Sequence, residues 1–128
     1  MTIGTLAQEA NVSVETVRYY QRVGLLEEPP KPTSGYRTYP PEALDQLLFI
    51  RRAKNFGFSL ADIGSLLKLG ESENSCQSAC ALAEKNLQAI KERKRELEEL
   101  EDQVSELLKR CRSSSGCAVL DALGRGSN

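Results

Sequence analysis

The chain contains no histidine and no tryptophan, and its aromatic residues are only four tyrosines and three phenylalanines. Without histidine it lacks the side chain that most often serves as a general acid or base. It also shows no nucleophile-and-base pair and no glycine-rich phosphate loop, so we expect no enzyme. No apolar run approaches the length of a membrane span, and the polar start does not resemble a signal peptide. The sequence therefore predicts a cytoplasmic protein without a membrane segment.

A strong charge of one sign is also missing, because the formal net charge is −1. Residues 1–70 carry eight basic and seven acidic side chains, and residues 71–128 carry nine and eleven. Bulk charge thus does not indicate a nucleic-acid-binding protein. Any contact with DNA must come from the local placement of basic side chains.

Four cysteines stand out against these absences. Thiols stay reduced in the cytoplasm, so cysteines there favour metal or redox chemistry over structural disulfides. A metal site in a chain without histidine must be built from thiolates, with or without carboxylates. Such a site prefers soft, thiophilic ions.

The second half of the chain is predicted to be one long helix, since no glycine or proline occurs from Glu71 to Ser115. Apolar residues recur in it at heptad spacing. These are Ala83, Ile90, Leu97, Val104 and Cys111, joined by Leu87, Leu100, Leu107 and Leu108. This pattern is typical of a coiled-coil seam. A long helix of this kind needs a partner, and we expect a second copy of the chain, which makes a homodimer.

The first half begins with two short predicted helices. The first covers residues 1–10, with Ile3, Leu6 and Ala7 facing inward, and the second runs from Val14 to about Val23. Ser13 is a suitable N-cap for the second helix, and Gly24 is a suitable stop. Two short helices joined by a tight polar turn are typical of a helix-turn-helix, whose second helix enters the major groove of DNA.

The residues that follow extend this pattern. A proline-rich stretch, residues 25–34, leads into an alternating segment at 35–39 that is suited to a β-type wing. A third helix is expected from Pro41, with a core face that includes Leu44, Leu47, Leu48 and Phe49. A fourth helix is expected after the N-cap Ser59.

Basic and tyrosine side chains are concentrated between residues 18 and 54. The candidate DNA-binding residues among them are Arg18, Tyr19, Tyr20, Lys31, Tyr36, Arg37, Tyr39, Arg51 and Arg52. Arginine contacts phosphate or guanine with two hydrogen bonds, and tyrosine hydroxyls donate to phosphate oxygens. An ordinary solvated surface, with some tyrosines in the core, is the alternative.

Several of these segments together resemble the MerR family of bacterial transcription regulators. They are residues 2–7, 14–26, 35–39, 49–52 and 57–63, and the resemblance covers residues 1–70 nearly throughout. It implies a winged helix-turn-helix homodimer bound to double-stranded promoter DNA at an inverted repeat. It also implies that bound effector distorts the promoter so that bacterial RNA polymerase can initiate. The protein then acts through the deformation energy of the DNA.

The spacing of the cysteines predicts where a metal would bind. Cys76 and Cys111 are 35 residues apart, about 50 Å along a continuous helix, so one chain cannot bring them together. An antiparallel helix pair places Cys76 of one subunit beside Cys111 and Cys117 of the other, which gives two interfacial sites per dimer.

The resemblance narrows the effector to metals. It places Cys76, Cys111 and Cys117 at the positions that bind Hg(II) in a planar three-thiolate site in mercury-sensing members of the family. Members that respond to Cd(II) or Pb(II) use the same positions. Cys80, four residues after Cys76, is a possible extra ligand for Cd(II), Pb(II) or Zn(II). A thiol-redox regulator with a Cys111–Cys117 disulfide is a further alternative.

The predicted fold is therefore mainly α. Residues 1–70 form a winged helix-turn-helix DNA-binding domain, and residues 71–112 a long antiparallel coiled-coil dimerisation helix. Residues 113–128 form a metal-binding loop, a short helix and a tail. The predicted function is a metal-responsive regulator of a mercury-resistance operon that represses without metal and activates with Hg(II).

Overall fold

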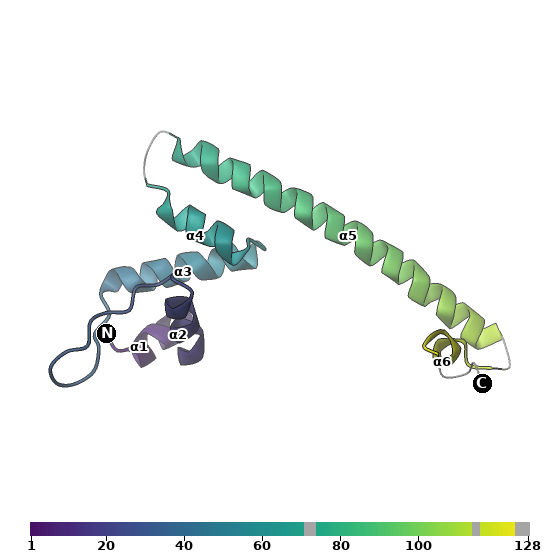
Figure 1. Cartoon of the computed structure of the whole chain (residues 1–128), viewed down its shortest axis with the longest axis horizontal. Helices are drawn as coiled ribbons and strands as arrows, with labels where there is room; N and C mark the ends of the chain where they lie inside the picture. Colours follow the sequence, from purple (N-terminus) through teal and green to yellow (C-terminus); the bar gives the residue numbers. More distant parts are fainter. Residues whose placement is uncertain (71–73, 114–115, 125–128) are drawn as a thin grey trace. The chain divides into compact units, whose positions relative to one another are not determined.

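A computed structural model describes residues 1–70, 74–113 and 116–124, and within these ranges all regular structure is helical (Figure 1). The helices are α1 (Ile3–Ala10), α2 (Val14–Arg22), α3 (Pro41–Asn55), α4 (Leu60–Lys68), α5 (Ser75–Ser113) and α6 (Ala118–Ala122). The chain divides into two compact units, Met1–Asn86 and Leu87–Asn128. Of the predicted segments 71–112 and 113–128, residues 71–73, 114–115 and 125–128 lie outside the described residues.

The first unit begins with the predicted helix-turn-helix. Thr2 caps α1 by accepting a hydrogen bond from the Thr5 backbone N–H, and Ser13 caps α2 by accepting one from Thr16. Asn11 ends α1 with a φ of 57°, a left-handed conformation that asparagine tolerates better than most residues. These local signals fix the short turn between the helices, as the sequence predicted.

Helix α2 ends because Gly24 takes up a φ of 83°, which only glycine adopts without strain. The chain then turns back, so that the N–H groups of Leu25 and Leu26 donate to the Tyr20 carbonyl at 2.9 and 3.2 Å. Both leucines are buried. The turn therefore brings the chain out of α2 and into the core at once.

The segment at the wing position differs from the prediction. Residues 26–40 form a broad loop between α2 and α3, and no strand is assigned to them (Figure 1). The prolines at 29, 30, 32 and 40 provide no N–H donors, which leaves too few for a ladder. One antiparallel pair remains, because Tyr39 N–H donates to the Met1 carbonyl at 2.7 Å and the Met1 ammonium donates to the Tyr39 carbonyl at 2.9 Å.

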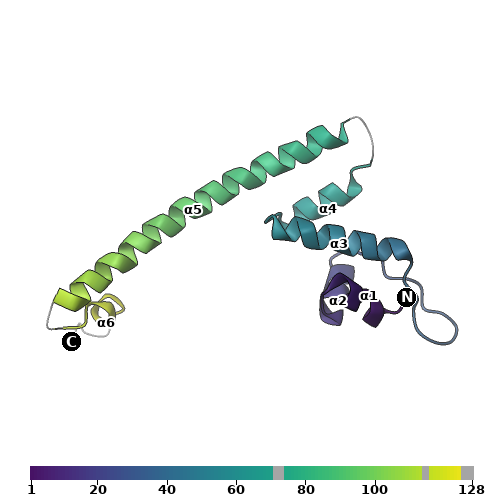
Figure 2. The ribbon, with the colours of Figure 1, turned by 180° about the vertical axis from the view of Figure 1, so that it is seen from behind.

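The core of the first unit lies between α1, α2 and α3, which lie side by side in both ribbon views (Figure 2). Leu6, Val17, Leu47 and Ile50 are fully buried. Phe49 was predicted to belong to the core face of α3, but it is 41% exposed. The reason is helical geometry, since Leu47 and Ile50 define the inward stripe at a spacing of three and Phe49 falls beside it.

Helix α4 and the first turns of α5 complete the first unit. Ser59 caps α4 by accepting a hydrogen bond from Asp62 N–H. Asp62 is buried and pairs with Lys85 of α5 at 3.1 Å. Asn86 Nδ2 donates to the Phe56 carbonyl at 2.8 Å. These two polar contacts attach the beginning of α5 to the DNA-binding-type helices.

The second unit contains most of α5, a helix of 39 residues, and the short helix α6. Most of its heptad residues are exposed, and the large exposed ones are Leu87, Ile90, Leu97, Leu100, Val104 and Leu108. Leu107 and Cys111 are half-buried. An exposed apolar stripe of this length on a single helix indicates a binding partner. Among the described residues, no helix combines the length and the apolar character that crossing a bilayer requires.

Candidate nucleic-acid interface and thiol groups

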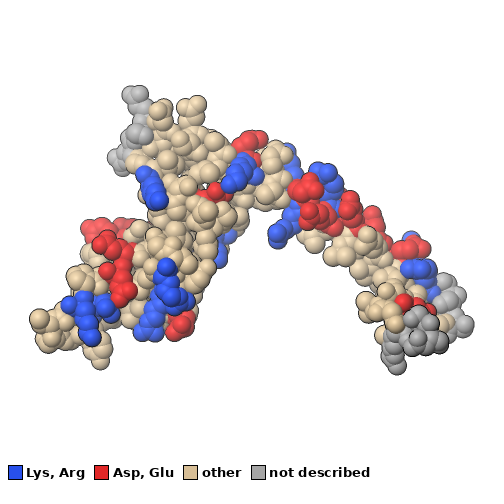
Figure 3. Space-filling view, viewed as in Figure 1, with Lys and Arg blue, Asp and Glu red and all other residues tan. Residues whose placement is uncertain are grey.

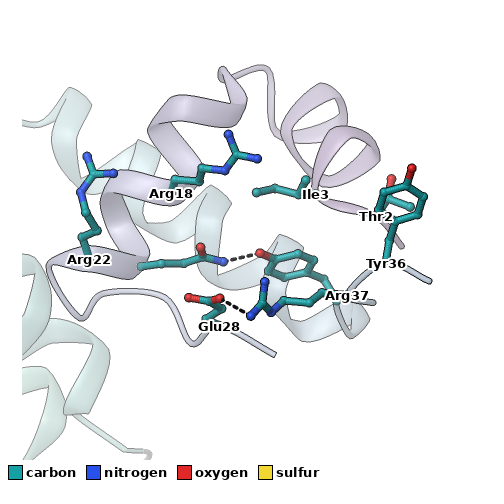
Figure 4. Close-up of a pocket in the computed structure, with 9 residues that line it drawn as sticks. Thr2, Ile3, Arg18, Arg22, Glu28, Tyr36 and Arg37 are labelled. Atoms are coloured by element: carbon teal, nitrogen blue, oxygen red, sulfur yellow. Dashed lines mark hydrogen bonds and ion pairs between the residues drawn. The ribbon is translucent and has the colours of Figure 1, made fainter. Parts of the chain in front are cut away.

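A hollow of about 680 Å³ lies on the first unit between α1, α2 and the wing loop (Figure 4). It is lined by Thr2, Ile3, Arg18, Gln21, Arg22, Glu28, Tyr36, Arg37 and Tyr39. Three arginines and one glutamate give it a positive balance. Figure 3 shows basic side chains over this part of the molecule, interspersed with acidic ones. The arrangement suits a polyanion better than a small neutral ligand.

Arg18 lies in the middle of α2, with its guanidinium held only loosely. Its Nη1 is 3.5 Å from Glu15 Oε1, and both side chains are largely exposed. Exposed ion pairs of this kind contribute little and break readily. Arg18 is therefore available for a phosphate or a base edge once DNA is near.

Arg22 follows Arg18 by one helical turn and was not among the predicted site residues. Its guanidinium carbon lies 5.8 Å from the centre of the Tyr19 ring, a cation–π arrangement. Tyr19 is itself partly exposed. The spacing of four residues from Arg18 is the sequence signal that could have identified Arg22.

The wing loop contributes Tyr36 and Arg37. Tyr36 is 87% exposed, which leaves its hydroxyl free of any cover. Arg37 is fixed by an ion pair with Glu28 at 3.1 Å and by a hydrogen bond from its Nε to the Pro29 carbonyl at 3.0 Å. The proline-rich loop thereby presents a basic group in a defined position.

Two of the tyrosines predicted to bind DNA are buried in the core. Tyr20 is 6% exposed and Tyr39 is 3% exposed. The Tyr39 hydroxyl accepts a hydrogen bond from Gln21 Nε2, shown as a dashed line in Figure 4. Burial, and to a lesser degree the neighbouring Tyr19, raises the pKa of the Tyr20 hydroxyl. These two tyrosines pack in the core beneath the exposed arginines, since few of their atoms reach solvent.

The remaining predicted DNA-binding residues are one arginine with a structural hydrogen bond and two exposed basic residues. Arg51 Nη1 donates to the Ala10 carbonyl at 3.1 Å, so it satisfies an orphan carbonyl at the end of α1. Arg52 and Lys31 are exposed. Arg52 lies on α3 and Lys31 on the wing loop, and neither lines the hollow of Figure 4.

The four thiols fall into two groups. Cys76 and Cys80 are exposed and lie one turn apart at the start of α5. A hydrogen bond with the Cys76 side chain, and then the charge of Cys76, raise the pKa of the Cys80 thiol. Cys111, near the end of α5, and Cys117, the N-cap residue of α6, are half-buried.

Among the described residues of one chain, no three cysteine, aspartate or glutamate side chains come together as a metal site. This agrees with the continuity of α5, which separates Cys76 from Cys111 by 35 residues of unbroken helix. A site that combines Cys76 with Cys111 therefore cannot form within one unbroken α5.

Family models and known proteins match nearly the whole chain. The model described as MerR HTH family regulatory protein matches residues 1–69, and the one described as MerR, DNA binding matches residues 44–107. The mercuric resistance operon regulatory protein of Serratia marcescens is 40% identical over 126 residues, which are 96% of this chain and 87% of that protein.

Two solved structures extend the likeness to the fold. A transcription regulator from Ralstonia metallidurans in complex with lead(II) has a TM-score of 0.81 and 34% identity, covering 97% of this chain and 99% of the other. MerR from Bacillus megaterium in complex with mercury(II) has a TM-score of 0.71 and 29% identity, covering 96% and 98%. The chain belongs to the MerR family of helix-turn-helix transcription regulators.

Proposed function

We propose that this chain is a metal-responsive regulator of a heavy-metal resistance operon, with Hg(II) as its effector. The observation that carries the proposal is the placement of three cysteines at the two ends of one unbroken helix. Cys76 precedes Cys111 by five heptads, so both lie on the same stripe of α5 as the apolar seam. Cys117 follows at the start of α6.

The exposed seam supports a homodimer as the working form. In an antiparallel pair the stripes of two α5 helices face each other, which removes the apolar side chains from water. The same pairing brings Cys76 of one subunit to Cys111 and Cys117 of the other. Dimerisation would then assemble the metal site, because the same pairing of helices brings the three cysteines together.

The donor set suits a soft ion. Three thiolates around a divalent cation leave one net negative charge, and thiolate ligands select thiophilic metals. The mercury-regulating relative from Serratia marcescens and the mercury(II)-bound structure from Bacillus megaterium favour Hg(II). The lead(II)-bound relative supports Pb(II) as an alternative effector, and Cd(II) and Zn(II) are further alternatives. For these three ions Cys80 is a candidate fourth ligand.

The DNA-binding surface is proposed from the exposed basic and aromatic residues of the first unit. Arg18, Arg22 and Tyr19 on α2 would reach the major groove, while Tyr36 and Arg37 on the wing would reach the flanking backbone. Two such surfaces in a dimer match an inverted repeat. Metal binding would distort the promoter between its half-sites so that bound RNA polymerase initiates, and the metal-free dimer would repress.

Single serine variants of Cys76, Cys111 and Cys117 test this proposal. Each should retain operator binding and lose mercury-dependent transcription, because two thiolates remain where three are needed. Cys80→Ser is the matched control, since it removes an exposed thiol of the same helix and should retain the response to mercury. A full mercury response in Cys76→Ser would refute the interfacial site. An oxidant response without metal, independent of Cys76, would instead favour a Cys111–Cys117 redox switch.

A further inference from the structure

A second hollow of about 480 Å³ lies within the first unit, where α3, α4 and the start of α5 meet. Its walls are mostly apolar and include Phe49, Phe56, Phe58 and Leu66. Phe49 and Phe56 are exposed, although aromatic side chains of this size usually gain from burial. The hollow offers space and aromatic contacts for a flat apolar group.

One wall of this hollow carries a thiol. Cys80 lines it together with two alanines of α5, whose small side chains leave the space open. Cys76 lies one turn earlier on the same helix, where residues at a spacing of four are neighbours. Both thiols are exposed, and their spacing on α5 places them on one face of the helix. A dithiol therefore adjoins an aromatic-walled hollow within a single chain.

This combination matches one class of ligand. A trivalent arsenic atom that carries one aryl group has two exchangeable positions, which two thiolates fill, and one carbon substituent, which does not exchange. We infer that Cys76 and Cys80 form a two-thiolate site for monoaryl arsenic(III) compounds, with the aryl ring in the hollow beside Cys80. The site needs neither Cys111 nor Cys117.

The binding step is balanced without an oxidant or a reductant. Phenylarsine oxide reacts with two thiols, so that two sulfur–arsenic bonds form and the arsenic–oxygen bonds break. Both thiol protons leave with the oxygen as one water molecule. Arsenic stays trivalent, and the carbon–arsenic bond stays intact.

This inference deepens the proposed function, because Cys76 belongs to both sites. Arsenic bound at Cys76 and Cys80 withdraws Cys76 from the three-thiolate site of the dimer. We therefore expect phenylarsine oxide to block the mercury response, because the two sites share Cys76.

The test uses the reduced full-length protein with phenylarsine oxide and, in parallel, inorganic arsenite. Mass spectrometry and titration of the remaining thiols should show one arsenic adduct and two thiols consumed per chain. The double variant Cys111→Ser/Cys117→Ser should form the same adduct, whereas Cys80→Ser and Cys76→Ser should lose it. The phenyl compound should bind roughly tenfold or more tightly than arsenite, because its ring is buried in the hollow.

Phe56→Ala tests the hollow, since it removes an aromatic wall residue whose side chain is mostly exposed and carries little of the core packing. It should reduce the preference for the phenyl compound while arsenite binding stays the same. Leu123→Ala, which truncates an exposed apolar side chain in the second unit, is the matched control and should change neither. Circular dichroism melting of every variant verifies the fold.

Three results would overturn the inference: an unchanged adduct in Cys80→Ser, loss of the adduct in the Cys111→Ser/Cys117→Ser variant, or equal affinity for the two arsenic compounds. They can be told apart from failure of the proposed function. Mercury-dependent transcription that requires Cys76, Cys111 and Cys117 stands whether or not the arsenic adduct forms, and the adduct can form in a protein with no mercury response.

Discussion

Replacing Arg37 by glutamine should weaken DNA binding and reduce its dependence on salt. Arg37 is the basic group that the wing loop holds in place, through Glu28 at 3.1 Å and the Pro29 carbonyl at 3.0 Å. Glutamine is polar but shorter and uncharged, so it removes the charge together with the two contacts that hold Arg37 on the loop. The salt dependence reports on the phosphate contact, and Glu28→Gln, which breaks the same ion pair but keeps the arginine, separates that contact from the shape of the loop.

The size of the effect follows from counterion release. Each phosphate contact contributes about 0.9 to the slope of log affinity against log salt concentration, so two copies in a dimer contribute roughly 1.8. At physiological salt this corresponds to about 1 kcal/mol per contact, or roughly 30-fold for the dimer. The Arg37–Glu28 pair has side chains 41% and 50% exposed and must loosen on binding, which offsets at most about 1 kcal/mol per copy. The loss of roughly 30-fold is therefore an upper limit, and the salt slope is the deciding quantity.

Fluorescence anisotropy on a duplex that carries the inverted repeat, repeated over a series of KCl concentrations, measures both quantities. Glu28→Gln should act in the opposite direction and tighten binding, because it frees Arg37. Arg95→Gln is the matched control, since Arg95 on α5 pairs with Glu92 at 3.0 Å with comparable exposure. A salt slope that stays the same in Arg37→Gln, or falls equally in Arg95→Gln, would refute the placement of the wing at the DNA backbone.

Two further predictions concern stability. Leu47→Ala deletes a fully buried side chain at the centre of the core and should cost about 2–5 kcal/mol of unfolding free energy, measured by urea denaturation; exposed Leu123→Ala should cost under about 0.5 kcal/mol. The raised pKa of Tyr20 predicts that stability is complete below about pH 10, the ordinary tyrosine pKa, and falls as pH rises through it. The reason is that the unfolded chain ionises there before the folded chain does. Tyr20→Phe should remove part of that alkaline loss, and an identical pH profile in the variant would contradict the assignment.

Local signals made much of the first unit predictable. Ser13 and Ser59 are N-caps in the structure as they were in the sequence, and Gly24 ends α2 with a positive φ. Caps and glycine stops act through atoms a few residues away, so the sequence contains all that they need. The heptad stripe of α5 could also be predicted from the sequence, because residues at a fixed spacing lie on the same face of a helix.

Contacts between distant segments were not predictable in this way. The tyrosine-rich, basic segment was read as a set of DNA contacts, yet Tyr20 and Tyr39 are buried. Tyr39 forms hydrogen bonds with Met1, 38 residues earlier in the chain, a pairing that no local pattern indicates. Arg51 likewise serves the end of α1, 41 residues away, by donating to the Ala10 carbonyl.

The sequence alone determined the family, the helices and the long seam, because caps, helix breaks and heptads are properties of neighbouring residues. It also determined that Cys76 and Cys111 cannot meet within one chain, since the length of an unbroken helix follows from its residue count. Only the tertiary structure decided which basic and aromatic side chains reach the surface and that Cys80 opens on an aromatic hollow. Those outcomes depend on which side chains from distant segments pack together, and packing is settled by shape and volume in three dimensions.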